Sequence, residues 1–187
     1  MIKPIYGTGQ IVFDLETNGL LNDTTHIHCL ALHWDEDDRI ESFNDEKYAS
    51  NPKDLPMGGG YSITTGLGFL ETADILVGHN IINFDIPVIK RLYPWFNPTG
   101  IIIDTLLLSR LYHPNLLDID NKTNKIPQKL RGRHSLEAYG HRLGEYKGDF
   151  SKTTDWKKWS QEMEDYCKQD VVVTKKLCNH FRPYLIG

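Results

Sequence analysis

The sequence predicts one α/β domain spanning residues 1–187, with a mixed β-sheet flanked by helices. Short apolar runs typical of strands alternate along the chain with longer stretches of helical periodicity. Hydrophobic residues make up 40% of the 187 residues, which is enough for a sizeable core. The first three predicted strands follow one another without an intervening helix, which indicates antiparallel neighbours.

Five segments are predicted to be strands, and an acidic turn joins the second to the third, as in a meander. The last two are short apolar runs, each followed by a helical segment. The predicted strands are residues 10–15, 27–34, 39–43, 75–78 and 101–103.

Five segments are predicted to be helices, namely residues 66–73, 84–93, 105–112, 135–143 and 156–181. Asp104 or Thr105 is the expected N-cap of the third helix, and Ser135 that of the fourth. Two stretches between these elements are expected to be loops: residues 45–67, which are rich in Pro and Gly, and the polar residues 114–133.

The composition narrows the classes of partner. The formal net charge is −4, so the chain lacks the positive charge of a protein that coats nucleic acid. No apolar run approaches the roughly 18 residues of a membrane span, and the N-terminus lacks the apolar core of a signal peptide. Three cysteines without a C-x-x-C pair support neither a disulfide framework nor a cysteine zinc site. We therefore expect an intracellular, cytoplasmic protein with no membrane partner.

Two carboxylates stand at the end of the first strand, in the sequence IVFDLETNGL at residues 11–20. Side chains alternate across a strand, so Asp14 and Glu16 project the same way. Ligand sites of open α/β sheets lie outside the carboxyl ends of the strands. Two solvated acids at a strand end are the alternative interpretation, and this motif alone does not exclude it.

Two further acids occupy comparable places. Asp85 opens a helix directly after the fourth strand, where an acid also satisfies the free N–H groups of the first turn. Asp170 follows Tyr166 by four residues on one helical face and precedes the apolar run 171–173, at a core boundary where an unpaired charge is costly. Taken singly, Asp85 and Asp170 have simpler interpretations, a helix-start acid and a surface acid.

The four acids together suit a metal site. Carboxylates that converge in one cleft repel each other and raise one another's pKa, and divalent cations between them remove that repulsion. Oxygen ligands favour Mg²⁺ or Mn²⁺ over zinc. Two such ions, about 3.5–4 Å apart, activate a water and stabilise the leaving oxygen of a phosphodiester. Such ions also let an acidic protein bind a phosphate.

The motifs FDLET, HNxxNFD and YCKQD resemble those of the DEDD 3′–5′ exonuclease superfamily, in its tyrosine branch. Longer stretches, among them HSLEAYGHRLGEYKGDF, resemble the N-terminal proofreading domain of phage family A DNA polymerases, over roughly residues 11–181. The resemblance implies an RNase H-like fold, with a five-stranded mixed sheet and helices on both sides. It also implies hydrolysis of the 3′-terminal phosphodiester to release nucleoside 5′-monophosphates.

The resemblance assigns roles to five residues, with two Mg²⁺ or Mn²⁺ ions per active site. Asp14, Glu16, Asp85 and Asp170 are the implied metal ligands, and Asp14 bridges both ions. Tyr166 positions the attacking water together with Glu16. The hydroxyl of Tyr166, with an ordinary pKa near 10, suits an orienting hydrogen bond better than a general base.

A second group of residues is expected to hold the substrate. The resemblance places Thr17, Asn18, Leu21, Asn80 and Asn83 near the terminal nucleotide, although Asn18-Gly19 is also an ordinary turn sequence. A basic segment is the other candidate, since its cations suit phosphates, although a solvated loop would look the same. Its basic residues are Lys122, Lys125, Lys129, Arg131 and Arg133.

The expected partner is single-stranded DNA or a frayed 3′ end, in the cytoplasm of the host cell if a phage encodes the protein. No polymerase palm, fingers or thumb follows in these 187 residues. The chain is therefore either a free-standing exonuclease or a piece of a split or truncated polymerase that works with a separate polymerase chain. Two other functions stay open: an exonuclease on short RNA, and a non-catalytic module that binds nucleic acid or a polymerase.

Overall fold

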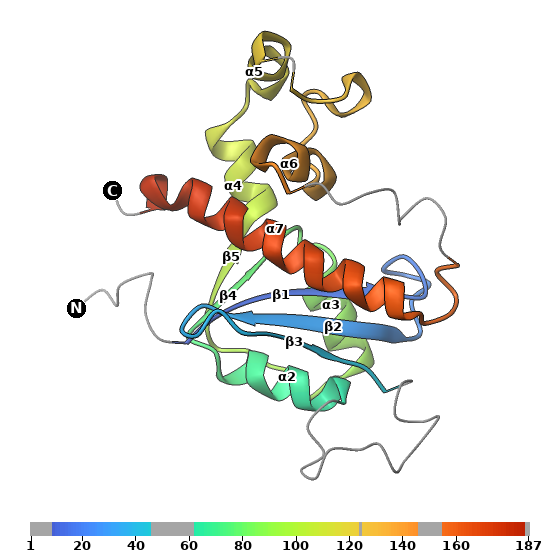
Figure 1. Cartoon of the computed structure of the whole chain (residues 1–187). Helices are drawn as coiled ribbons and strands as arrows, with labels where there is room; N and C mark the ends of the chain where they lie inside the picture. The colour runs from blue at the N-terminus through green and yellow to red at the C-terminus, as the bar shows by residue number, and fades with distance from the viewer. Residues whose placement is uncertain (1–8, 46–61, 124, 146–154, 186–187) are drawn as a thin grey trace, which may run out of the picture.

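The computed structural model describes residues 9–45, 62–123, 125–145 and 155–185 (Figure 1). A five-stranded sheet with the spatial order β3-β2-β1-β4-β5 forms its centre. The strands are β1 (Gln10–Thr17), β2 (Ile27–Trp34), β3 (Ile40–Phe43), β4 (Ile75–Gly78) and β5 (Ile101–Asp104). The five-stranded mixed sheet expected from the resemblance is confirmed.

Both kinds of strand pairing occur in the sheet. β1 pairs antiparallel with β2, and β2 with β3, as the meander predicted. β1 also pairs with β4, and β4 with β5, and these pairs are parallel. The register aligns Val12 with Val77, so β1 and β4 end at the same edge of the sheet. This edge is where the polar motifs follow the strands.

The helices lie on both faces of the sheet (Figure 1). They are α2 (Ile63–Thr72), α3 (Asp85–Leu92), α4 (Thr105–Tyr112), α5 (Leu116–Thr123), α6 (Leu136–Leu143) and α7 (Gln161–Leu185), with the short 3₁₀ helix η2 (Gln128–Leu130) after α5. Asp104 caps α4 and Ser135 caps α6, as expected. No helix in the described part of the chain is long and apolar enough to cross a membrane.

Two core clusters show how the faces of the sheet are covered. Ile11, Phe13 and Leu15 of β1 belong to a cluster formed with α2 and α3. Val12, on the opposite face, belongs to a cluster with residues of α7. The strand therefore alternates between two buried faces, as expected of a central strand.

Several boundary predictions were wrong. β1 ends at Thr17 and α7 at Leu185, both beyond their predicted ends. The polar stretch 114–133 contains α5 and η2, because Leu116, Ile126 and Leu130 are buried and anchor it. The last helix begins at Gln161 and not near residue 156, since the Ser160 hydroxyl accepts a hydrogen bond from the Met163 N–H and caps it. α2 begins three residues earlier than predicted, after its N-cap Ser62, and the rest of the predicted loop up to residue 61 lies mostly outside the described residues.

Candidate active site

The two acids of β1 face α7. Val12 packs against α7, and residues two and four positions further along a strand share its face. Asp14 and Glu16 therefore continue the α7 side of β1, where the strand leaves the core. Glu16 is 9% exposed.

A tight turn brings Asp85 to the same edge. β4 ends at Gly78, where a Cβ would lie 2.1 Å from Ile81 Cγ2 and 3.1 Å from the Phe13 carbonyl oxygen. Asn80 then takes a φ of 66°, and α3 begins at Asp85. Asp85 is 4% exposed, and its carboxylate accepts hydrogen bonds from its own N–H and from that of Leu15 in β1.

α7, which packs against β1, contains the remaining two site residues, Tyr166 and Asp170. Cys167 and Val171 pack into the core between the helix and the sheet. Tyr166 and Asp170 are one helical turn apart, and the Tyr166 hydroxyl donates a hydrogen bond to the Asp170 carboxylate. The same helix face thus fixes Tyr166 and Asp170 relative to the carboxylates of β1.

The four carboxyl groups act on one another electrostatically. Burial raises the pKa of Asp14 well above its ordinary value, and the charges of Glu16, Asp170 and Asp85 raise it further. Burial and the charges of Asp170 and Asp85 likewise raise the pKa of Glu16. The structure therefore brings together in one place the four acids expected to meet there.

The other two acids and the tyrosine are shifted in the same direction. Burial raises the pKa of Asp85 and of Asp170 to about 7 each. Burial and the charges of Asp170, Glu16 and Asp14 raise the pKa of Tyr166 far above its ordinary value, so its hydroxyl stays protonated at neutral pH. Four acids, one of which already accepts the Tyr166 proton in a hydrogen bond, make a site that attracts cations.

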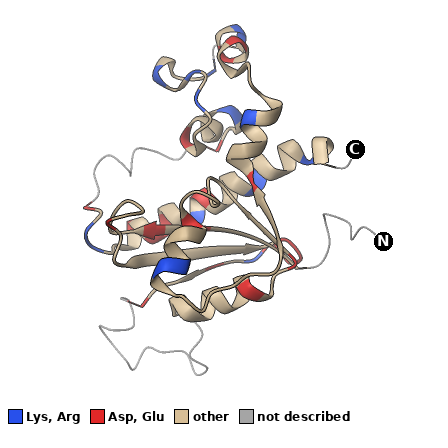
Figure 2. Cartoon of the chain, turned by 180° about the vertical axis from the view of Figure 1, so that it is seen from behind, with Lys and Arg blue, Asp and Glu red and all other residues tan. Residues whose placement is uncertain are grey.

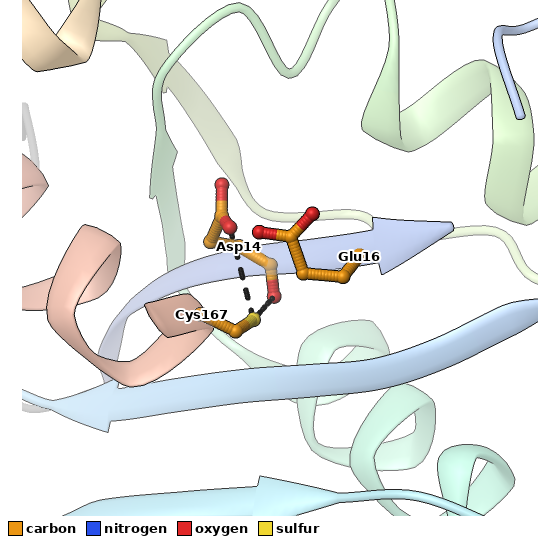
Figure 3. Close-up of side chains that lie close together, drawn as sticks. All are labelled: Asp14, Glu16 and Cys167. Atoms are coloured by element: carbon orange, nitrogen blue, oxygen red, sulfur yellow. Dashed lines mark hydrogen bonds between the residues drawn. The ribbon is translucent and has the colours of Figure 1, made fainter. Parts of the chain in front are cut away.

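Cys167 lies beneath Asp14 and is drawn with it and Glu16 in Figure 3. Its Sγ donates to the Asp14 carbonyl oxygen at 3.4 Å and approaches Asp14 Oδ2 at 3.7 Å. Ligand atoms of Asp14, Glu16 and Cys167 all lie within 4.8 Å of one another. Burial raises the pKa of Cys167 well above its ordinary value, so it is a protonated thiol that donates a hydrogen bond, and not a thiolate.

The donor set fits Mg²⁺ or Mn²⁺. Hard carboxylate oxygens dominate it, and a neutral thiol is not the form of cysteine that binds metals. Burial and, after it, the charges of neighbouring carboxylates raise the pKa values of Asp14 and Glu16, so the ionised site lacks a compensating cation. Divalent cations among Asp14, Glu16, Asp85 and Asp170 would balance that charge.

Comparison with known proteins fits this arrangement of fold and site. A family model described as the RNase H superfamily matches residues 11–182. The chain belongs to the RNase H superfamily.

Within this superfamily, the chain resembles phage polymerases. It is 35% identical to a DNA-directed DNA polymerase of Escherichia phage T7 over 197 residues, and 34% identical to that of Enterobacteria phage T3 over 193. Each match covers 90% of this chain and 26% of the polymerase, so the chain spans about a quarter of the length of these relatives. The predicted resemblance to phage DNA polymerases is confirmed.

Solved structures with the same fold include nucleases. One, described as the apo form of the nuclease, has a TM-score of 0.62 at 18% identity. The match covers 95% of this chain and 73% of the nuclease chain. Brucella melitensis NrnC with bound Mg²⁺ has a TM-score of 0.59 at 16% identity, with 95% and 74% covered. The RNase H-like fold is therefore confirmed.

The turn after β1 uses two of the expected substrate residues internally. The Thr17 hydroxyl donates to the Gly19 carbonyl at 2.7 Å. Asn18 Oδ1 accepts from the Thr25 and His26 N–H groups at 3.0 and 3.1 Å. These bonds match the turn interpretation of Thr17 and Asn18, and a substrate contact by either residue stays a prediction.

Leu20 and Leu21 in the turn after β1 differ in exposure. Leu21, the residue expected to contact the substrate, packs partly against the core, whereas Leu20 is 77% exposed. Sequence periodicity cannot separate two adjacent leucines in a turn. A substrate contact by Leu21 stays a prediction.

The turn after β4 presents the other two expected residues. Asn83 is exposed, and its Nδ2 lies 3.4 Å from Asn80 Oδ1. His79, next to Asn80, hydrogen-bonds Thr105 Oγ1 through Nδ1 at 2.9 Å, and burial lowers its pKa to about 4. A neutral, bonded His79 agrees with a structural role in this turn.

Proposed function

We propose that the chain is a metal-dependent 3′–5′ exonuclease that removes nucleoside 5′-monophosphates from the 3′ end of single-stranded DNA. The observation that carries the proposal is the convergence of Asp14, Glu16, Asp85 and Asp170, each with a raised pKa. Burial raises all four pKa values, and neighbouring carboxylates raise those of Asp14 and Glu16 further, a combination typical of functional sites. The similarity to DNA polymerases supports DNA as the substrate.

The chain's acids would hold two Mg²⁺ or Mn²⁺ ions. When bound, such ions lower the pKa of a water and stabilise the charge on the leaving oxygen. Asp14 and Glu16 approach from β1, Asp85 from α3 and Asp170 from α7, so three separate elements fix the ligand set. Rigid elements hold ligands more precisely than loops do.

Tyr166 would orient the attacking water. Its hydroxyl keeps its proton because burial and three neighbouring carboxylates raise its pKa. A protonated phenol cannot be a general base, but it can hold a water by a hydrogen bond while Glu16 accepts from the same water.

A basic surface would bind the phosphates of the strand further from its end. Residues 121–133 contain five Lys or Arg and no Asp or Glu, in a chain with a net charge of −4. They belong to the α5–η2 segment, here defined as residues 114–123 and 125–133, which Figure 2 shows projecting from the domain with its basic residues in blue. Concentrated positive charge on an acidic protein suits a polyanion.

Two arginines of the α5–η2 segment hydrogen-bond its own backbone, whereas its lysines face solvent. Arg131 Nε donates to the Ile126 carbonyl at 3.2 Å, and Arg133 Nε donates to the Lys129 carbonyl at 2.8 Å. Lys122, Lys125 and Lys129 are exposed, and within the described ranges no hydrogen bond or ion pair of their side chains is found. These lysines are the proposed phosphate contacts.

Short RNA is the second candidate substrate. NrnC, which has the same fold with a TM-score of 0.58, has been solved bound to pGG. That resemblance, at 16% identity, concerns the fold, whereas the 35% sequence identity to a phage DNA polymerase favours DNA. A separate polymerase chain is the proposed protein partner if the chain is not free-standing.

A time course on 5′-labelled oligonucleotides tests the proposal. With Mg²⁺, we expect single-stranded DNA to shorten stepwise from its 3′ end, a mismatched 3′ end to be attacked faster than a paired one, and a chelator to stop the reaction. Matched RNA oligomers should be degraded more slowly. Faster loss of RNA would favour the second candidate, and no cleavage of either would favour a non-catalytic binding module.

A further inference from the structure

Asp104 is a buried acid outside the proposed ligand set, at the end of β5. It is 3% exposed, and its carboxylate accepts three backbone N–H groups. Oδ1 accepts from Leu106, at 2.9 Å, and thereby caps α4. Oδ1 also accepts from Asn80, at 2.9 Å, and Oδ2 accepts from Ile82, at 3.1 Å.

The two bonds to Asn80 and Ile82 reach a turn that needs external support. Asn80 has a φ of 66°, a left-handed conformation that is uncommon outside glycine. Gly78, at the start of the turn, pairs with Asp104 in the sheet, and the next residue, Thr105, donates its hydroxyl to the Gly78 carbonyl at 3.0 Å. Neighbouring side chains thus hold both the start and the middle of the turn.

The turn connects directly to the proposed site. Its backbone bonds run from the N–H of Phe84 to the Asn80 carbonyl at 3.1 Å and from the N–H of Ile86 to the Ile81 carbonyl at 2.9 Å. Asp85 lies between Phe84 and Ile86 as the first residue of α3. The conformation at Asn80 therefore determines where α3, and with it the Asp85 carboxylate, begins.

We propose that Asp104 is a positioning residue of the candidate active site, whose carboxylate fixes the Asn80–Ile82 turn and thereby the placement of Asn80 and Asp85. The inference rests on the proposed function for what Asn80 and Asp85 do. A carboxylate suits the position because all three partners are donors and both of its oxygens accept. An amide would present its NH₂ group to one of these N–H groups.

Three variants separate this role from helix capping. Asp104→Ser keeps an N-cap for α4 but is too short to reach Asn80 and Ile82, so the turn alone is released. Asp104→Asn keeps the oxygen shared by Asn80 and Leu106 and loses the acceptor for Ile82. Ser135→Ala is the control, since it removes the cap of α6, where Ser135 Oγ accepts from the Ala138 N–H, and leaves the turn intact.

Amide hydrogen exchange, Mn²⁺ titration calorimetry and steady-state kinetics are measured on each variant. For Asp104→Ser we expect faster exchange at Asn80 and Ile82, about tenfold weaker Mn²⁺ binding and about tenfold higher KM on single-stranded DNA, as for loss of a residue that orients ligands. Asp104→Asn should fall between this variant and the unmodified chain. Ser135→Ala should lower the Tm without changing Mn²⁺ affinity or KM.

Two results would overturn the inference. Exchange at Asn80 and Ile82 unchanged in Asp104→Ser would show that the carboxylate does not hold the turn. Faster exchange with unchanged Mn²⁺ affinity and KM would show a merely structural role. If the unmodified chain neither bound Mn²⁺ nor cleaved DNA, the proposed function would fail, and the inference would fail with it. That result differs from the two above because it is seen without any substitution.

Discussion

Asp85 and Asp120 are both buried acids, 4% and 1% exposed, but their surroundings differ. Asp120 in α5 accepts hydrogen bonds from Arg142 Nε at 3.0 Å, from Arg142 Nη2 at 2.7 Å and from the Gly132 N–H at 2.9 Å. Burial alone would raise the pKa of Asp120, yet these bonds outweigh it and keep the pKa below its ordinary value. At Asp85, burial raises the pKa and the negative charge of Asp104 raises it further, to about 7.

The difference in charge environment indicates a structural role for Asp120 and a ligand-binding role for the acid cluster. The chain supplies its own cation to Asp120, and the pair ties the α5–η2 segment to α6. The cluster of Asp14, Glu16, Asp85 and Asp170 has raised pKa values throughout, which is costly unless cations come from solution. A buried acid with a built-in partner is structural, and a buried cluster of like charges indicates a ligand.

The largest expected effect concerns the cluster. Asp14→Ala and Asp170→Ala should each lower kcat on single-stranded DNA by about a thousandfold, since each removes a ligand from a site that depends on charge stabilisation. Both variants should keep the circular dichroism spectrum of the unmodified chain. Asp118→Ala, an exposed acid of α5, is the control and should retain activity. Full activity in either cluster variant would refute the assignment.

The next effect concerns the paired acid. Asp120→Ala should lower the free energy of unfolding by about 3 kcal/mol, because it leaves the Arg142 guanidinium buried without its partner. Urea denaturation measures this, and Lys90→Ala on an exposed surface is the matched control. If Asp120→Ala lowered the free energy of unfolding no more than the control does, the Asp120–Arg142 pair would not stabilise the fold.

The two regions should also respond to pH in opposite directions. Asp85 and Asp170 have folded pKa values near 7, above those of the unfolded chain, so the folded state binds more protons between about pH 4 and 7. Without metal, stability from this cluster is therefore lost as pH rises towards 7, by about 10 °C or more in Tm between pH 5 and 8.

The opposite sign applies to Asp120, whose lowered pKa gives stability that is lost as pH falls below its ordinary range. Differential scanning calorimetry with a chelator measures both trends. The variant pair Asp85→Asn and Asp170→Asn should reduce the loss above pH 5, with the remainder due to Asp14 and Glu16. An unchanged pH profile in these variants would contradict the account of the cluster.

A smaller effect is expected of the hydroxyl group. Tyr166→Phe should lower kcat by about tenfold and leave Mn²⁺ binding unchanged, since it removes one hydrogen bond, to Asp170, and no ligand. Single-turnover kinetics distinguish this from the loss in Asp14→Ala. An equal loss in the two variants would be inconsistent with an orienting role for Tyr166.

The smallest effect concerns the α5–η2 segment. Replacing Lys122, Lys125 and Lys129 with Gln should reduce the slope of log affinity against log salt for single-stranded DNA by about 2, at about 0.7 per phosphate contact. Cleavage of a dinucleotide, too short to reach these lysines, should not change. Lys90→Gln with Arg91→Gln, which removes exposed charge from α3, should leave the slope as it was. If both sets of substitutions changed the slope equally, the lysines of the α5–η2 segment would not be specific phosphate contacts.

Features that depend on neighbours in the sequence were predicted more accurately than features that depend on contacts between distant residues. The strand at Ile27–Trp34 and the helix at Thr105–Tyr112 were predicted at their observed bounds, since apolar pattern and capping residues act locally. The meeting of Asp14 with Asp170, 156 positions apart, was predicted from the placement of the acids and their shared metal chemistry, and the motif resemblance supplied further tertiary information.

Other features could not be predicted for the same reason. Helix α5 is held by a pair between Asp120 and Arg142 that lie 22 residues apart, and a polar sequence without periodicity gives no sign of it. The exposure of Leu20 instead of Leu21 depends on how the turn packs. Asp104 was recognised as a helix cap, but its bonds to Asn80 and Ile82 exist only in the folded chain.

Diffraction from a crystal grown with Mn²⁺, collected at a wavelength where manganese scatters anomalously, is the most direct test of the central claim. The account predicts two anomalous peaks among the carboxylates of Asp14, Glu16, Asp85 and Asp170. Side chains turned away from one another, with no manganese between them at saturating concentration, would contradict it.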